Sequence, residues 1–249
     1  AVEASATTRV FERARQLRQE GRDIISLEVG EPDFETPAPV VAATQKALAD
    51  HETRYGAVCG IDPLRTTLAE AFPDYGRENI IVTNGAKQGL FSLFQALINP
   101  GDAVILSKPC WVSFTEQIKL AGGRPVLVET DHHQLDPDAI STAVTDSTRA
   151  IVINTPNNPT GAVYDQSALE AVARIAEKHG CWVILDEAYH AFTFGERRHM
   201  NTTNLPLDPR LKITVRSFSK QDNMTGFRIG YVAADQSVIS ASADLQSHL

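Results

Sequence analysis

The sequence predicts an α/β protein with a mostly parallel seven-stranded sheet and helices on both faces. From residue 79 onwards, short apolar runs alternate with segments of helical periodicity, which is the pattern of repeated strand–helix units. Strands that are apolar throughout are typical of a sheet covered on both sides. The 249 residues are 43% hydrophobic and 22% charged, which is the composition of an ordinary soluble globular protein.

The first part of the chain precedes this alternation. Apolar residues at helical spacing predict a helix over 8–19, which Gly21 ends. The run 23–29 is β-like, and it leads into a loop, Gly30-Glu31-Pro32-Asp33. A second helix is expected over 38–50.

The regular part of the chain supplies the elements of the sheet. Strands are expected at 80–83, 103–107, 124–128, 150–154, 182–185, 212–217 and 229–233. Helices are expected at 86–98, 111–120, 137–144 and 166–179. Residues 244–248 are interpreted as the beginning of a further helix.

Charge and cysteine content limit the kinds of binding partner and the cellular location expected for this chain. Lys and Arg number 23 against 31 Asp and Glu, and a net charge of −8 disfavours nucleic acid and anionic membranes as partners. No apolar run reaches membrane-spanning length. Cys59, Cys110 and Cys181 have no paired spacing, which favours a reducing, cytoplasmic location. His132 and His133 lack a further ligand at metal-binding spacing, so no metal site is expected.

Ligands of open parallel sheets bind beyond the carboxyl ends of the strands, so the loops there are the places to look for chemistry. The first such loop contains Gly85 at a strand-to-helix turn, where free backbone N–H groups can bind an anion. The second, 154–161, contains two prolines and a glycine, and it presents Asn158 from a rigid loop. Taken alone, each loop also fits a simple helix start or turn.

The third and fourth loops carry charged residues. Asp186 follows an apolar strand, and Tyr189 comes three residues later. A strand that delivers a carboxylate also suggests a nucleotide hydrolase, but the phosphate-binding string Gly-x-x-x-x-Gly-Lys-Ser/Thr is absent from the sequence. The fourth loop joins Ser-Phe-Ser-Lys, which ends at Lys220, to Arg228. These groups would form a cationic pocket rich in hydroxyl groups.

Together, in this order and each after a strand, the four loops resemble the class I/II aminotransferases, fold-type-I enzymes that use pyridoxal 5′-phosphate (PLP), and in particular the aspartate aminotransferase-like members. The resemblance runs from about Ser5 to the end and includes the Gly30 loop and Tyr55-Gly56. It implies an enzyme that moves an amino group from an amino acid, with Asp or Glu as candidates, to a 2-oxo acid through a Lys220 aldimine.

The resemblance implies roles for individual residues around the cofactor ring. Lys220 forms the Schiff base and then moves the proton from the substrate Cα. Asp186 pairs with the pyridine nitrogen and keeps it protonated. Asn158 and Tyr189 are the donors to the 3-hydroxyl oxygen, and Trp111 stacks on the ring. Glu187 points the other way along its strand and receives no role.

The resemblance also implies how phosphate and substrate are held. The phosphate ligands would be Gly85, Ala86, Lys87, Ser217, Ser219, Arg228 and, across a homodimer interface, Tyr55 of the neighbouring subunit. The substrate would contact Gly30, Trp111, Asn158 and Lys87, with the Lys87 ammonium reading a distal carboxylate.

Members of this family are longer and end in a small C-terminal domain. The expected organisation is therefore residues 1–35, which would pack with the small domain, and 36–249 as the PLP-binding large domain. The arginine for the substrate α-carboxylate would lie outside this chain. Three explanations stay open: a fragment, a site completed by a second polypeptide, or a natural short variant. A PLP lyase or synthase of the same fold and a truncated non-catalytic protein are the alternative functions.

Overall fold

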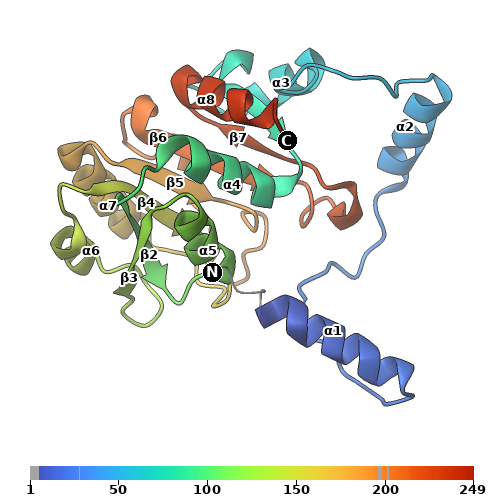
Figure 1. Cartoon of the computed structure of the whole chain (residues 1–249), viewed down its shortest axis with the longest axis horizontal. Helices are drawn as coiled ribbons and strands as arrows, with labels where there is room; N and C mark the ends of the chain where they lie inside the picture. Colours follow the sequence, from blue (N-terminus) through green and yellow to red (C-terminus); the bar gives the residue numbers. More distant parts are fainter. Residues whose placement is uncertain (1–5, 28, 196–197, 201) are drawn as a thin grey trace.

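The computed structural model of the chain describes residues 6–27, 29–195, 198–200 and 202–249. Within these residues the strands form one sheet in the order β1-β7-β6-β5-β4-β2-β3 (Figure 1). Their bounds are β1 Ile80–Thr83, β2 Ala103–Lys108, β3 Arg124–Glu129, β4 Thr148–Asn154, β5 Trp182–Asp186, β6 Lys212–Ser217 and β7 Gly230–Ala233. The prediction of seven strands is confirmed.

Strand direction decides where the strand ends meet. The neighbours from β3 to β6 pair in parallel, whereas β7 is antiparallel to both β1 and β6. The carboxyl ends of the parallel strands therefore lie at one edge of the sheet, and β7 begins at that same edge. The sheet is mostly parallel, as predicted.

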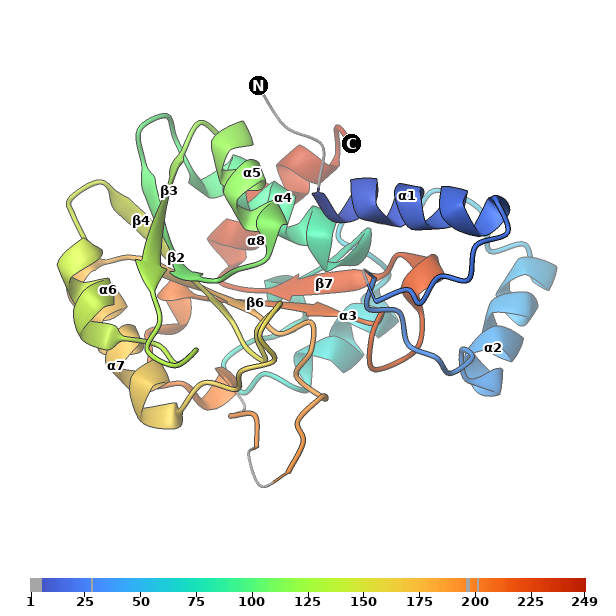
Figure 2. The same cartoon turned by 90° about the horizontal axis from the view of Figure 1, so that it is seen from below.

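Helices cover both faces of the sheet (Figures 1 and 2). One face packs against α4 (Gly85–Leu97), α5 (Val112–Leu120) and α8 (Gln236–Gln246). The other packs against α6 (Pro137–Ala143) and α7 (Gln166–His179). Side chains alternate between the two cores: Val104 and Leu106 join the first, and Ile105 joins the second. Each fully buried aliphatic side chain of this kind contributes about 1.5–3 kcal/mol.

The N-terminal segment lies outside these layers (Figure 1). Helix α1 spans Ala6–Gln19, and Gly21 follows it with a φ of +80°, as expected for the residue that ends it. Helix α2 spans Ala38–Ala49 and buries no residue. The β-like run 23–29 forms no strand in its described residues, so that prediction is wrong; Glu28 lies outside them. Ile25 and Leu27 are 86% and 89% exposed, because apolar alternation cannot make a strand without a partner.

Two helices were not predicted as they occur. Helix α3 spans Asp62–Ala69 and carries proline in its first turn, but its eight residues show too little periodicity to stand out. Residues 244–246 end helix α8 rather than begin a helix, which corrects the interpretation above. The helix starts after Asp235, whose Oδ1 accepts a hydrogen bond from Ser237 N at 2.9 Å. The short 3₁₀ turns are η1 Arg77–Asn79, η2 Thr202–Asn204, η3 Pro209–Leu211 and η4 Thr225–Phe227.

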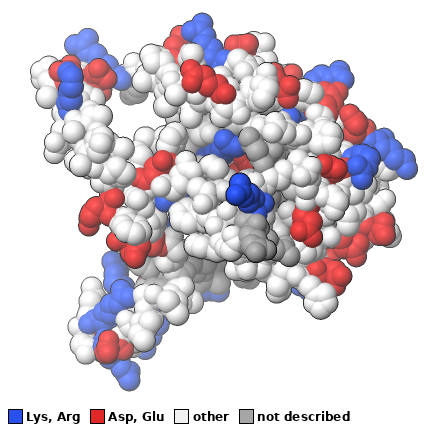
Figure 3. Space-filling model, turned by 180° about the vertical axis from the view of Figure 1, so that it is seen from behind, with Lys and Arg blue, Asp and Glu red and all other residues white. Residues whose placement is uncertain are grey.

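Two surface properties bear on function. No helix in the described part of the chain has both the length and the apolar character needed to cross a membrane. Acidic and basic side chains are interspersed over the face seen in Figure 3.

Candidate functional site

The strand ends bring several of the predicted residues to one edge. Asn154 at the end of β4 pairs in register with Asp186 at the end of β5. In the antiparallel part of the sheet, Gly230 pairs with Thr83 of β1 on one side and with Ser217 of β6 on the other. The first turn of α4 and the segments after β5 and β6 therefore meet above one edge of the sheet (Figure 2).

Two glycines allow an unusually close approach at this edge. Gly85 opens α4 with a φ of +74°, and a Cβ at this residue would lie 2.4 Å from Nη2 of Arg228. A Cβ at Gly230 would lie 2.5 Å from the backbone nitrogen of Ala86. Larger residues at either position would push the guanidinium or the start of α4 away. The glycines thus hold the Arg228 cation against the N-terminus of a helix.

Hydroxyl groups complete this cradle. Arg228 Nη1 donates to Ser219 Oγ at 3.3 Å and to the Thr225 carbonyl at 3.0 Å. Ser219 N donates to Ser217 Oγ at 3.1 Å. The Asn84 side chain makes no capping hydrogen bond to the first turn of α4, so these N–H groups are free to face an anion. A guanidinium, two hydroxyls and a helix N-terminus form an anion site suited to a dianion. We call this set the anion cradle: Gly85, Ala86, Lys87, Ser217, Ser219 and Arg228.

Lys220 lies beside the cradle, three residues after the end of β6. Its half-buried Nζ donates to the carbonyl oxygen of Gly30 and lies 6.0 Å from the centroid of the Tyr189 ring. Burial lowers the pKa of Lys220; Glu31 raises it, and the Arg228 charge lowers it further. A lowered pKa increases the fraction of neutral amine, which is the nucleophilic form.

Asp186 is a buried carboxylate, 4% exposed, at the end of β5. Its Oδ1 accepts a hydrogen bond from Ala188 N at 3.0 Å, and none of the ion pairs among the described residues includes it. Burial raises the pKa of Asp186 to about 6; the hydrogen bond from Ala188 lowers it, and Glu187 raises it. A cationic group placed against Asp186 would offset the cost of burying the negative charge and would lower the pKa of Asp186 again.

The loop after β4 is held by asparagine side chains. Asn154 Oδ1 accepts from Asn158 N at 2.7 Å, and Asn154 Nδ2 donates to the Asp186 carbonyl at 3.1 Å. Asn157 Oδ1 accepts from Thr160 N and Oγ1 at 3.2 and 2.8 Å. These bonds fix the Asn158 backbone beside the end of β5.

Tyr189, three residues beyond Asp186, is half-buried. Burial raises the pKa of Tyr189, and the Asp186 charge raises it further. Its hydroxyl therefore stays protonated near neutral pH and can donate a hydrogen bond.

Trp111 and Lys87 face each other. Trp111 precedes α5, and Lys87 belongs to the first turn of α4. Lys87 Nζ lies 5.1 Å from the centroid of the Trp111 ring, and the ring packs edge-on against Phe114 at a centroid distance of 5.4 Å. Tyr55, in contrast, is fully exposed between α2 and α3, and no interaction described in this chain joins it to the other candidate residues.

Glu187, for which the sequence predicts no role, has a fully buried carboxylate. Its Oε1 accepts from His199 Nε2 at 2.9 Å and from Thr202 Oγ1, and its Oε2 accepts from Arg216 Nε at 2.7 Å. Burial alone would raise the pKa of Glu187, but the His199 hydrogen bond and the Arg216 charge lower it to about 2. The cluster ties β5 and β6 to the segment around η2. An acidic residue directly after an apolar strand was the only available signal.

Glu187→Gln should therefore destabilise the fold by about 3 kcal/mol, because it leaves the buried Arg216 cation without its counter-charge. Since the folded pKa of Glu187 lies below its unfolded value, its contribution is present above about pH 4 and is lost as the pH falls towards 2. Urea unfolding at pH 7 and pH 3 measures both effects. Glu129→Gln, in the exposed pair with Lys108, is the matched control. Equal losses in the two variants would contradict this role.

Comparison with known proteins places these residues in a family. The family model described as aminotransferase class I and II matches residues 22–249. An aspartate aminotransferase of Geobacillus stearothermophilus is 39% identical over 98% of the chain, and an aspartate/prephenate aminotransferase of Thermus thermophilus is 42% identical over 99%. The chain spans 64% and 66% of the length of these two relatives.

Solved structures agree with this result over nearly the whole chain. The Thermus thermophilus aspartate aminotransferase with maleate superposes with a TM-score of 0.94 at 41% identity, covering 99% of this chain and 66% of that one. The Thermotoga maritima aspartate aminotransferase gives 0.93 at 36% identity, covering 99% and 68%. The matched residues contain both the sheet and the strand-end loops, and the chain therefore belongs to the class I and II aminotransferase family, whose aspartate aminotransferases depend on pyridoxal phosphate.

Proposed function

We propose that this chain is the cofactor-binding part of an aminotransferase that moves an amino group from an amino acid to a 2-oxo acid. The observation that carries the proposal is the convergence of Lys220, Asp186 and the anion cradle at one edge of the sheet. An amine, a buried carboxylate and a dianion site match the aldehyde, the pyridine nitrogen and the phosphate of PLP.

The residues present fit this cofactor. The phosphate matches the cradle, because Gly85 and Gly230 let the Arg228 guanidinium and the backbone nitrogen of Ala86 come closer than a Cβ would allow. The protonated pyridine nitrogen matches the buried Asp186 carboxylate, which lacks a cation among the described ion pairs. When bound, pyridoxal phosphate supplies the electron sink that stabilises negative charge on the substrate Cα.

Each side chain then has its own role in binding the cofactor or in moving a proton. Lys220 Nζ is the group that would hold the cofactor covalently, and, once free, it takes the proton from the substrate Cα. Asp186 would keep a proton on the ring nitrogen through a charge-assisted hydrogen bond. Asn158 and Tyr189 would donate to the ring hydroxyl oxygen, and Trp111 would stack on the ring and exclude water.

A product assay tests the proposed reaction. The purified chain, loaded with PLP, is expected to show an absorbance band that shifts when an amino acid is added, and to form a new amino acid from an added 2-oxo acid. Pyruvate and ammonia in place of a new amino acid would indicate a β-eliminating lyase. A band that ignores amino acids would indicate a non-catalytic PLP protein.

Lys87 and Gly30 are our candidates for contact with the substrate. Lys87 Nζ lies over the Trp111 ring at the edge of the site, and Gly30 accepts a hydrogen bond from Lys220. A cation at Lys87 favours a substrate with a distal carboxylate, such as aspartate or glutamate. The names of the relatives, and the maleate bound to the Thermus enzyme, support a dicarboxylic substrate.

Lys87→Ala is therefore expected to lower kcat/KM for aspartate by about tenfold or more, the value of one charge-assisted hydrogen bond, and to change kcat/KM for alanine or phenylalanine little. A substrate panel on the PLP-loaded protein measures this difference. Lys119→Ala, at an exposed position near the end of α5, is the matched control. Equal losses for aspartate and phenylalanine would show that Lys87 does not read the side chain of the substrate.

The active unit is proposed to be a homodimer with shared sites. Tyr55 is fully exposed on the segment between α2 and α3, and α2 buries no residue within its own chain. A C2 dimer would bring Tyr55 to the phosphate of the neighbouring subunit, where its hydroxyl adds a donor to the cradle.

A mixture of two variants, the inactive Lys220→Ala and the impaired Tyr55→Ala, tests this arrangement. Neither Lys220→Ala nor Tyr55→Ala should be fully active alone, because each lacks one part of every site. In a mixed dimer, one site combines Lys220 from one subunit with Tyr55 from the other, so about a quarter of the wild-type activity should return when half the dimers are hybrids. Hybrids that form without any return of activity would contradict a role for Tyr55 across the interface.

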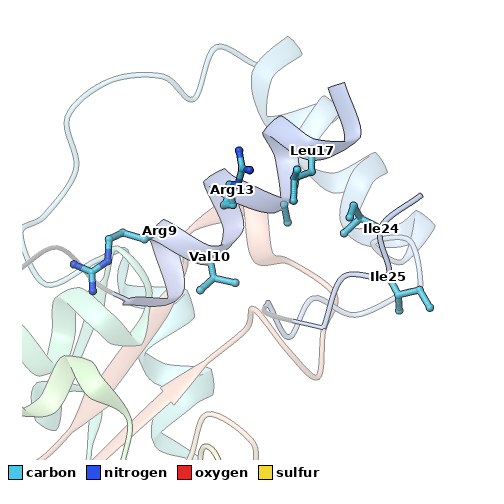
Figure 4. Close-up of a pocket in the computed structure, with 7 residues that line it drawn as sticks. Arg9, Val10, Arg13, Leu17, Ile24 and Ile25 are labelled. Carbon is cyan, nitrogen blue, oxygen red and sulfur yellow. The ribbon is translucent and has the colours of Figure 1, made fainter. Parts of the chain in front are cut away.

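We also propose that residues 1–35 pack with a small domain and that residues 36–249 form the PLP-binding large domain. Side chains of α1 and of the extended segment after it, among them Val10, Leu17, Ile24 and Ile25, line an apolar hollow outside the sheet layers (Figure 4). An apolar hollow of this kind is suited to packing against a further domain.

A further inference from the structure

The turn that opens α4 is fastened by a glutamine one turn along the same helix. Gln88 Oε1 accepts a hydrogen bond from the backbone nitrogen of Asn84 at 2.9 Å. The amide nitrogen of the same side chain donates to Ser92 Oγ at 2.7 Å and to Oε1 of Gln246 at 3.3 Å. The amide oxygen of Gln88 thus binds the turn, and its amide nitrogen binds side chains outside the turn.

Gln246, in the last turn of α8, provides the second half of the connection. Its Nε2 donates to the carbonyl oxygen of Val82 in β1 at 3.0 Å and to that of Val58 at 2.6 Å. The two glutamines therefore link the strand before the turn, the turn itself and the helix that packs on α4. We call this pair of side chains the glutamine relay.

The relay bears on the anion cradle because it leaves the first backbone N–H groups of α4 free. It occupies the N–H of Asn84, which precedes the helix, and leaves the N–H groups of Gly85, Ala86 and Lys87 without side-chain caps. Helices α6 and α8 differ in this respect, since Asp136 and Asp235 cap their first turns. The turn is thus held in place without any acceptor being placed where an anion would sit.

We propose that Gln88 and Gln246 are positioning residues that aim the first-turn N–H groups of α4 at the cofactor phosphate. This inference rests on the proposed function, because it takes the phosphate of PLP as the anion. Neither side chain touches the phosphate in this arrangement. Each acts through the backbone of the turn, and loss of the relay allows the turn to shift away from its hydrogen-bonding geometry.

A comparison of two ligands separates positioning of the cradle from general stability. Pyridoxal carries the same ring and aldehyde as PLP but no phosphate, so the ratio of the two dissociation constants reports on the cradle alone. Gln88→Met, Gln246→Met and the double variant remove the amides with little change in side-chain volume. Gln236→Met, on the exposed first turn of α8, makes the same substitution outside the relay.

Each relay variant is expected to bind PLP about tenfold more weakly, the value of a misaligned hydrogen bond to a charged group, and to bind pyridoxal as the wild type does. The double variant should lose no more than about the larger single loss, because the two side chains act as one unit. Gln236→Met should change neither constant.

Equal weakening of PLP and pyridoxal binding would overturn the inference, because the relay would then contribute only to the general stability of the protein. Unchanged PLP binding in both single variants would overturn it as well. A wild-type protein with no preference for PLP over pyridoxal would overturn the proposed cradle itself, and therefore the proposed function, which keeps the two failures distinguishable.

Discussion

Replacing Lys220 with alanine is expected to remove turnover while leaving a folded protein. The half-buried amine of Lys220 lies between the Gly30 carbonyl and the Tyr189 ring, and no other described lysine takes part in those two contacts. Loss of a general base alone lowers a rate by about 10²–10⁴-fold, and the loss of the covalent attachment adds to this. The anion cradle does not depend on Lys220, so PLP should still bind without a covalent bond.

Borohydride reduction of the PLP-loaded protein measures the attachment directly. In the wild type, the cofactor mass should appear on the peptide that contains Lys220, and in Lys220→Ala on no peptide. Lys178→Ala, at the exposed end of α7, should behave as the wild type. Reduction that labels a different lysine in the wild type would end the assignment.

Asp186→Asn is expected to have opposite effects on catalysis and on stability. The asparagine keeps the size of the side chain and an acceptor for the Ala188 N–H, but it loses the negative charge. With PLP bound, the ring nitrogen loses its counter-charge, which should raise the activation barrier by about 3 kcal/mol, a loss of about a hundredfold in kcat.

Without the cofactor, the same substitution should stabilise the protein. Burial raises the folded pKa of Asp186 to about 6, above its ordinary value of 3.8, so the folded protein holds a proton that the unfolded chain releases. The contribution of Asp186 to stability is therefore most favourable below about pH 4 and is lost as the pH rises to 6. Asp186→Asn removes this loss, worth about 3 kcal/mol above pH 6 for a shift of about two pKa units.

Denaturant unfolding of the PLP-free protein at pH 4 and pH 8 measures this effect. The gain of Asp186→Asn over the wild type should appear at pH 8 and vanish at pH 4. Asp165→Asn, at the start of α7, is the matched control. A gain of the same size at both pH values would show that the effect does not come from the ionisation of Asp186.

The sheet could be predicted from the sequence because its strands have clear local sequence patterns. β1 and β6 were placed at their observed bounds, since each is an apolar run next to a clear turn or helix signal. Helix α8 was missed for the opposite reason: QSVISASADLQ contains many small and polar residues, and its burial of Val238 and Ile239 depends on tertiary contacts. The segment 23–27 has a strand-like pattern but no partner strand.

The candidate site divides in the same way. Residues at the carboxyl ends of strands, such as Asp186 and Ser217, could be named from the sequence, because these ends meet at one edge of the sheet by topology alone. The ion pair of Glu187 with Arg216 and the relay of Gln88 with Gln246 join residues 29 and 158 positions apart. Nothing in local periodicity marks such partners.

The antiparallel direction of β7 has a consequence for folding kinetics. Its pairing with β6 joins Ser217 to Gly230, 13 positions apart, whereas the parallel pair β5–β6 joins Val183 to Lys212, 29 positions apart. Among the strand pairings described, the β6–β7 hairpin therefore closes the shortest loop and has the smallest entropic cost. Contacts that are local in sequence tend to form early. The loop of this hairpin contains Lys220 and Arg228, so these two side chains are expected to come together before the parallel strands complete the sheet around them.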